Sequence, residues 1–421
     1  MQAIIAFIFI FCLIVIIHEF GHFYFAKRAG ILVREFAIGM GPKLFSHRGQ
    51  ETTYTVRMLP LGGYVRMAGM EEMAEELAVG QQILIRQNDS GLVNFISMDA
   101  EANHTEGLPL EVHQADLEDD LFIAGIAYGD SQVKKFHLAE DAIIEEVDGT
   151  RVRIAPRYRQ FQAASLGQRM MVNFAGPMNN FILAIVTFII LAFVQGGVMT
   201  NQPVAGEIVA NSPAQAAGLQ AGDQLLAVDG QDISSFDNFI SQVQASNQET
   251  IDLTIDRNGS QRSITVTPDV EQGQNGQTVK QIGVYRPKNT SFWAKIAFGF
   301  SQTWAIITGI FAVFKEIFTT GFNINYFGGP VYMYQATSQV VGLGFTGLLS
   351  WLGALSVNLG IVNLLPIPAL DGGKLVFNVI EGIRGKPVSE KTQSIVSLIG
   401  VALVFILMVM ITWNDILRLF G

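Results

Sequence analysis

The chain has 421 residues, of which 49% are hydrophobic and 15% are charged, and its formal net charge is −10. Soluble globular proteins usually carry about 25% charged residues, so this composition indicates long uncharged segments and excludes a disordered or collagen-like chain. The single cysteine excludes an intramolecular disulfide and a zinc site built from thiolates. There is no basic stripe of the kind that binds nucleic acid. Acidic residues instead gather in 71–150, with 19 Asp and Glu against 3 Lys and Arg.

Four segments are apolar over about 20 residues, the length that crosses a bilayer. They predict transmembrane helices at 1–26, 171–195, 344–378 and 394–413. The first segment has neither a basic start nor a small-residue cleavage site, so we expect it to stay uncleaved. Basic residues follow the first span, precede the second and separate the third from the fourth. The positive-inside rule therefore places both termini and residues 197–343 outside, and residues 27–170 inside.

A fifth uncharged segment, 296–314, complicates this topology. If it crossed the membrane, the basic cluster at 374–392 would lie outside, which contradicts the charge rule. We therefore expect an interfacial helix over 291–318, with a fifth span as the alternative.

Three further regions each have a distinct sequence pattern. Residues 30–70 read as strands, because YTVRM alternates apolar and polar side chains and LPLGGY supplies turn residues. Residues 71–168 form an acidic insertion that we expect to be a separate cytoplasmic domain, of α+β or β structure. Residues 201–287, on the outer side, contain a strand start at 206–208, the run SPAQAAGLQAGDQLLAVDGQDI and a helix near 236–244. Two alternating strands then meet at Asn258-Gly259. This order resembles a PDZ domain.

The first predicted span contains the motif His18-Glu19-Phe20-Gly21-His22. Residues four apart lie on one face of a helix, so both imidazoles can reach one ion, and Glu19 can address a water at that ion without being a ligand. The alternative is that these polar side chains are satisfied by neighbouring helices. Ionisable residues inside a membrane are costly and mostly functional, which favours the metal site.

A catalytic zinc site needs three protein ligands and an open position, so two histidines do not complete it. No further histidine lies in or beside a predicted span, and Asp371 is the candidate third ligand. The predicted topology puts His22 and Asp371 at the inner ends of the first and third spans, at similar depth. The alternative is that Asp371 is a helix N-cap or an interfacial carboxylate.

Proline and asparagine interrupt two of these spans. Pro366 and Pro368 break the third span just before Asp371, and irregular backbone at membrane depth is tolerated inside protein or along a water-filled cavity. Gly176-Pro177 and Asn179-Asn180 in the second span fit the same need for water. A tight helix contact with interhelical hydrogen bonds explains them equally well.

Taken together, HEFGH in the first span, GPMNNF in the second, one PDZ-like region and NLLPIPALDGG in the third resemble the site-2 protease family of intramembrane zinc metalloproteases. The resemblance covers nearly the whole chain and is to the bacterial RseP-type branch, in a Gram-positive-like form with one PDZ-like domain and a large insertion. It implies a polytopic α-helical membrane protein with four transmembrane helices, a membrane-associated β-hairpin, a cytoplasmic acidic insertion and one extracytoplasmic PDZ-like domain.

The resemblance also implies roles for single residues. His18, His22 and Asp371 match the ligands of Zn²⁺, Glu19 matches the catalytic glutamate, and Asn363 matches an asparagine that holds the substrate backbone. Residues 34–67 correspond to a membrane re-entrant hairpin whose edge strand pairs with an unwound substrate.

The implied reaction is peptide-bond hydrolysis within transmembrane segments of single-pass proteins, such as anti-sigma factors and signal-peptide remnants. The implied location is the bacterial cell membrane, with the active site toward the cytoplasm. Two other functions fit parts of the sequence. A membrane scaffold with a degenerate metal site is disfavoured because Glu19 and Asp371 are both present, whereas an inactive relative usually lacks one of them. A metal or ion transporter is disfavoured because there are four predicted spans and no inverted repeat.

Overall fold

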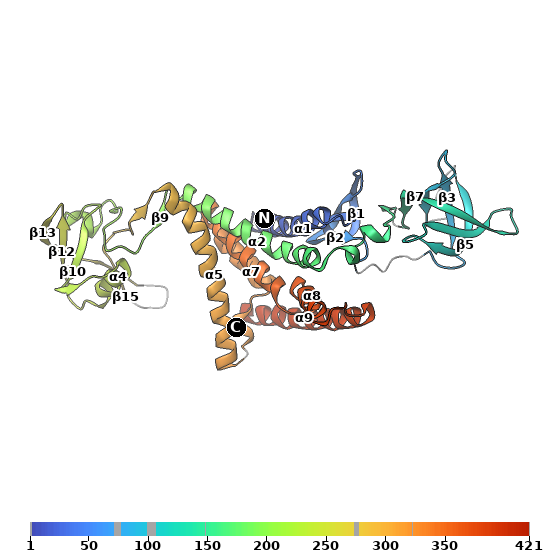
Figure 1. Cartoon of the computed structure of the whole chain (residues 1–421). Coiled ribbons are helices and arrows are strands. Elements are labelled where there is room, and N and C mark those ends of the chain that lie inside the picture. The colour runs from blue at the N-terminus through green and yellow to red at the C-terminus, as the bar shows by residue number, and fades with distance from the viewer. Residues whose placement is uncertain are drawn as a thin grey trace. The chain divides into compact units, whose positions relative to one another are not determined.

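The computed structural model describes residues 2–70, 77–98, 107–147, 149–272, 278–321 and 323–420 (Figure 1). The chain divides into two compact units. One comprises residues 1–187 and 302–421, and the other comprises residues 188–301. The first unit contains the hairpin region, the acidic insertion and most of the helices that surround the candidate site.

Five described helices are long and apolar enough to cross a membrane, judged by length and composition. They are α1 (Gln2–Arg28), α2 (Leu166–Val194), α5 (Phe292–Thr320), α7 (Gly344–Leu364) and α9 (Glu390–Phe420). Since α5 is among them, length and composition do not select four spans over five.

Helices α1 and α7 run in the same direction. Ile10 and Ile14 in the first half of α1 pack with Leu352 in α7. Further along the chain in each case, His18 of α1 lies beside Asp371, which follows the end of α7. Between α5 and α7 the described residues form η3 (Ile324–Tyr326) and α6 (Pro330–Val341), whose 12 residues are fewer than the roughly 20 that a span needs. If α5 crossed the membrane, α7 would run antiparallel to α1. The parallel packing therefore favours an interfacial position for α5, which stays a prediction.

The segment predicted as one helix over 344–378 is two helices. Helix α7 ends at Leu364, and the six residues 365–370 separate it from α8 (Asp371–Arg384). Pro366 and Pro368 lie in the connection, where proline removes amide donors and its ring blocks helical continuation. The break predicted from these prolines is present, and the continuous helix is wrong.

The hairpin region is more complex than two paired strands. Each of residues 35–38 in β1 (Val33–Arg48) has two partners in β2 (Thr53–Met67), one within 63–66 and one within 53–56. Segment 53–57 pairs on its other side with 43–48. The segments therefore lie in the order 43–48, 53–57, 33–38, 63–67, and the predicted turn LPLGGY connects the two parts of β2. Segment 63–67 is an edge of this sheet.

The described residues of the acidic insertion form a β domain, which favours one of the two predicted structures. Its strands are β3 (Gln82–Gln87), β4 (Val93–Ser97), β5 (Leu108–Asp116), β6 (Phe122–Ala127), β7 (Val133–Glu145) and β8 (Arg151–Arg153). Their order is β4-β3-β5-β6-β7-β8, and an additional pairing of β4 with β7 closes five of them into a barrel. Buried aliphatic side chains such as Ile83, Ile96 and Ile123 fill the interior. Residues 71–76, 99–106 and 148 of the predicted domain lie outside the described residues. The 3-10 turns η1 (Arg157–Arg159) and η2 (Phe161–Ala163) lead to α2.

The second unit has a sheet in the order β11-β10-β12-β13, covered by α4 (Phe236–Ala245). The strands are β10 (Gln224–Val228), β11 (Gln231–Asp232), β12 (Ile251–Arg257) and β13 (Ser260–Val266). Asn258 and Gly259 both have positive φ, as the predicted hairpin turn requires. The strand start predicted at 206–208 is wrong, because Ile208 makes only an isolated bridge to Val284. The remaining elements are β9 (Val198–Met199), α3 (Pro213–Ala216), β14 (Asp269–Gln272), β15 (Thr278–Gln281) and β16 (Lys288–Asn289).

Single cysteines test the membrane topology. In a Cys12→Ser background, we expect residues 165 and 389 to be labelled from the cytoplasm and residues 212 and 260 from outside, when Ser165, Ser389, Ser212 and Ser260 are replaced one at a time. The measurement is labelling by an impermeant thiol reagent in intact cells and in inside-out vesicles. External labelling at position 389 would show that α5 crosses the membrane.

Candidate active site

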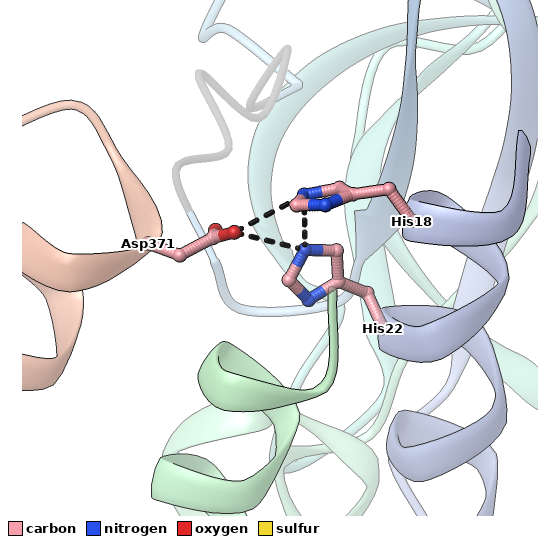
Figure 2. A group of neighbouring side chains, drawn as sticks. All are labelled: His18, His22 and Asp371. Carbon is pink, nitrogen blue, oxygen red and sulfur yellow. Dashed lines mark hydrogen bonds and ion pairs between the residues drawn. The ribbon is translucent and has the colours of Figure 1, made fainter. Parts of the chain in front are cut away.

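Three side chains from two distant parts of the chain converge on one point (Figure 2). The Nε2 atoms of His18 and His22, both on α1, lie 3.2 Å apart. The Oδ2 atom of Asp371, at the start of α8, lies 3.1 Å from Nε2 of His18 and 3.3 Å from Nε2 of His22. The two histidines are 7% and 8% exposed. Three potential ligand atoms thus form a nearly equilateral triangle in the protein interior.

This triangle fits zinc. A tetrahedral zinc site with bonds of about 2.0–2.1 Å separates its ligand atoms by roughly 3.3 Å. No described residue gives the buried Oδ2 atom of Asp371 a hydrogen bond of acceptable geometry, which is costly for a carboxylate oxygen. Two imidazole nitrogens and one carboxylate are a known ligand set of catalytic zinc and leave a fourth position open. The donor set, its spacing and the unsatisfied oxygen all fit a bound cation.

Glycine allows α2 to lie against α1 at this point. A Cβ atom on Gly21 would lie 2.4 Å from the carbonyl oxygen of Ala175, so a larger residue could not occupy this contact. One residue further along α2, a Cβ atom on Gly176 would lie 2.4 Å from Nε2 of His22 and 2.6 Å from Nε2 of His18. The backbone of α2 therefore forms one wall of the triangle.

Hydrogen bonds from α2 orient both imidazole rings. Nδ1 of His22 lies 2.8 Å from the carbonyl oxygen of Val172, which can only accept, so the ring is protonated at Nδ1 and Nε2 carries a lone pair. Nδ1 of His18 lies 3.1 Å from the amide Nδ2 of Asn180, whose Oδ1 is buried without a partner among the described residues. The oxygen and nitrogen of an amide are assigned from the hydrogen-bond network, and exchanging them gives Nδ1–H of His18 a carbonyl acceptor. Both Nε2 atoms are then free to bind a metal.

Two features position Asp371. Gly372 and Gly373 lie so close to the preceding loop that Cβ atoms there would be 2.2 Å from the carbonyl oxygen of Leu365 and 2.4 Å from that of Ile367. Further along α8, Arg169 of α2 donates two hydrogen bonds to Glu381, at 2.9 and 2.6 Å. Both side chains of this pair are mostly buried, and a two-pronged pair of this kind fixes orientation as well as distance. The glycines hold the start of α8 against the preceding loop, and the ion pair holds its far end against α2.

The other predicted residues lie nearby in different surroundings. Glu19 is half-buried on α1, and a Cβ atom on Gly63 of β2 would lie 3.3 Å from its Cγ, so the edge segment 63–67 passes close to this carboxylate. Asn363 is half-buried near the end of α7, and its side chain has no hydrogen-bond partner among the described residues.

The asparagines of α2 make contacts between helices. Nδ2 of Asn179 donates to the carbonyl oxygen of Ile17 at 3.0 Å, and Ser356 of α7 donates to the carbonyl oxygen of Asn180 at 2.8 Å. The helix-contact interpretation of Asn179-Asn180 therefore holds. Sequence reasoning missed the contact of Asn180 with His18. The four-residue spacing from Gly176 to Asn180, which puts both on one face of α2, was the available signal.

Comparison with known proteins identifies the family. The sequence model of peptidase family M50 matches residues 6–407. The chain belongs to peptidase family M50. The "probable protease eep" of Enterococcus faecalis is 46% identical over 425 residues, which cover 100% of both chains. The zinc metalloprotease RasP of Geobacillus kaustophilus is 42% identical over 428 residues, which cover 100% of this chain and 99% of the relative.

The predicted resemblance to the site-2 protease family is thereby confirmed, and the chain is a zinc metalloprotease. A solved PDZ domain of an SdrC-like protein from Listeria monocytogenes covers 21% of this chain and 90% of that chain, at 19% identity and a TM-score of 0.18. At that score the likeness does not decide the fold of residues 201–287, and the PDZ assignment remains a prediction from the sequence.

Replacing Gly176 tests the wall of the triangle. We expect Gly176→Ala to push the imidazoles apart and to reduce zinc content and peptidase activity by roughly tenfold or more. Gly167→Ala on the same helix is the matched control, because a Cβ atom there meets no atom within 4 Å. Zinc per purified chain, measured by mass spectrometry, and cleavage of a membrane-protein substrate are the readouts. Equal zinc in the two variants would contradict the packing argument.

Proposed function

We propose that this M50 peptidase hydrolyses peptide bonds within the transmembrane segments of membrane proteins. One observation carries the proposal: the three potential zinc ligands, of which His18 and His22 are buried and Asp371 is partly buried, lie where the start of α8 meets α1, a helix long and apolar enough to cross a membrane. A site in that position reaches the backbone of a membrane-embedded substrate more readily than that of a soluble protein. Because α1 and α7 run in the same direction, the end of α1 that carries the histidines and the end of α7 that precedes Asp371 would lie toward one membrane face.

In this proposal His18, His22 and Asp371 hold the zinc ion. A bound zinc ion supplies Lewis-acid activation of a water molecule and of the scissile carbonyl. The ring orientations set by Val172 and Asn180 support the ligand roles, because each leaves the Nε2 lone pair directed at the triangle. The negative charge of Asp371 would partly neutralise the charge of a bound Zn²⁺, which lowers the net charge of the site in its apolar surroundings.

Glu19 is the proposed general base. It follows His18 directly on α1, so it lies beside the triangle without being one of its corners. It would take a proton from the attacking water and then deliver it to the nitrogen of the leaving amine, which completes hydrolysis. Asn363, whose amide has no partner among the described side chains, would donate to or accept from the substrate backbone.

Segment 63–67 is the proposed substrate-binding edge. A transmembrane helix hides its carbonyl groups in its own hydrogen bonds, so it must unwind before hydrolysis, and pairing with an edge strand can replace the lost bonds. The contact of Gly63 with Glu19 brings this edge to the proposed base. The sheet also exposes apolar side chains suited to a position within lipid, among them Met40, Leu44, Phe45, Met58 and Leu59.

The natural substrates would be single-pass proteins whose spans contain helix-weakening residues. Anti-sigma factors and signal-peptide remnants are the classes that the family resemblance implies. Residues 201–287, which we expect to lie outside the cell as a PDZ-like domain, would restrict access by excluding bulky outer domains. The active site would lie toward the cytoplasmic face of a bacterial membrane.

Paired substitutions separate the proposed base from the proposed ligands. We expect Glu19→Gln to keep one zinc per chain and to lose cleavage, because the proton acceptor alone is removed. Asp371→Ala should lose both zinc and cleavage. The measurements are metal content of the purified protein and cleavage of a reporter span with a central Gly-Pro pair, with a poly-Leu span as control. Full zinc content in Asp371→Ala would contradict its role as a ligand, and equal cleavage of the poly-Leu span would contradict the need for unwinding.

Asn180 offers a test that does not depend on turnover. We expect Asn180→Leu to weaken zinc affinity by about 10–100-fold, because His18 loses the partner that fixes its ring. Asn180→Asp keeps an acceptor of the same size and should retain most of the affinity. Competition with a chromogenic chelator measures both constants. Equal affinity of Asn180→Leu and the unmodified protein would refute the orienting role.

A further inference from the structure

A polar hollow of about 390 Å³ lies apart from the zinc ligands, where α1 ends. It is lined by Lys27 of α1, Arg153 of β8, Tyr54 of β2 and the turn between β1 and β2, which contributes Gln50, Glu51 and Thr52. Neither the peptidase reaction nor the proposed substrate edge uses this hollow.

Positive charge exceeds negative charge in the hollow. Glu51 accepts hydrogen bonds from Nζ of Lys27 and Nη1 of Arg159, both at 2.9 Å. Nη1 of Arg153 lies 3.9 Å from the same carboxylate, and Arg153 forms no hydrogen bond with any described residue. The side chains of Lys27, Arg153 and Arg159 are 34%, 24% and 24% exposed. Three partly buried cations thus share one carboxylate.

The carboxylate is ionised at neutral pH, so this charge count holds. Hydrogen bonds from Arg159 and Lys27 lower the pKa of Glu51 to about 2. A second hollow of about 210 Å³ shares Gln50 and Arg153 with the first. It adds Arg48 and Asp141, whose charges cancel. The lining residues of the two hollows then carry one excess positive charge, and Arg159, which binds Glu51 from beside the lining, makes it two.

We propose that this hollow binds the phosphate group of an anionic ligand. Excess cations that are partly removed from water are stabilised by an anion, and a guanidinium that makes no hydrogen bond presents a fork of donors that matches phosphate oxygens. Lys27 belongs to the last turn of α1, a candidate membrane span, so the hollow lies near the depth of lipid phosphates. The phosphate could come from an anionic phospholipid headgroup or from a soluble phosphate compound.

Binding there would join three parts of the first unit. Lys27 is five residues beyond His22 on α1, Glu51 lies in the turn of the sheet that contains segment 63–67, and Arg153 follows the acidic barrel. A bound phosphate would therefore fix the sheet and the barrel to the helix that carries both histidines.

The test uses the full-length protein, delipidated in a neutral detergent. The probes are inorganic phosphate and dihexanoyl phosphatidylglycerol, with chloride at equal ionic strength and zwitterionic dihexanoyl phosphatidylcholine as controls. A ligand that binds the folded state raises the midpoint of thermal unfolding in a saturable way, which yields its affinity. Saturation by phosphatidylglycerol alone would assign a lipid headgroup, and saturation by inorganic phosphate would assign the soluble source. A response to neither probe, or one that follows ionic strength, would overturn the proposal.

Three variants make the assignment specific. We expect Arg153→Gln to weaken binding at least tenfold, and Arg28→Gln, which changes an exposed neighbouring base, to leave binding unchanged. Glu51→Gln removes the competing carboxylate and should tighten binding, whereas a purely structural role for Glu51 predicts weaker binding. Equal affinity of Arg153→Gln and Arg28→Gln, or weaker binding by Glu51→Gln, would refute the site. If Arg153→Gln does not fold, the result for Glu51→Gln still decides.

Discussion

Helix α2 approaches α1 so closely at Gly21 that the carbonyl oxygen of Ala175 occupies the place of a side chain. In lipid, where apolar surface gives little drive for association, small residues let helix backbones pack and polar groups meet across them. This one contact brings Gly176 against the imidazoles and places the partners of both rings, the Val172 carbonyl and the Asn180 amide, on the same face. The geometry of the candidate metal site therefore depends on a helix that supplies none of its candidate ligands.

The third corner of the site depends on a different constraint. Asp371 begins a helix that could not follow α7 directly, since the prolines of the connection cannot continue the helical hydrogen bonds. Gly372 and Gly373 let the connection fold back over the start of α8, and Arg169 fixes the far end of α8 to α2. Because α2 contacts α1 and α8 through separate interactions, it sets the distance between the histidines and the aspartate.

The sequence contained enough to predict the candidate ligands, because the spacing of His18 and His22 fixes them on one face of a helix. Asp371 could be proposed from its place at the end of a span. The hydrogen-bond partners of the histidines could not be predicted, because the face of α2 that meets α1 is decided by tertiary contacts. The double pairing of residues 35–38 was also hidden, because alternation identifies strands without identifying their neighbours. The barrel closure required the pairing of β4 with β7, about 45 residues apart, for which no local signal exists.

That closure has a consequence for an enzyme that handles extended peptide. An open sheet offers rows of free amide and carbonyl groups that capture any unfolded strand nearby. In the described part of the insertion, pairing of β4 with β7 removes both edges of the five-stranded barrel, and the three-residue β8 is the short strand left outside it. A domain built in this way would not compete for an extended peptide segment near the candidate site.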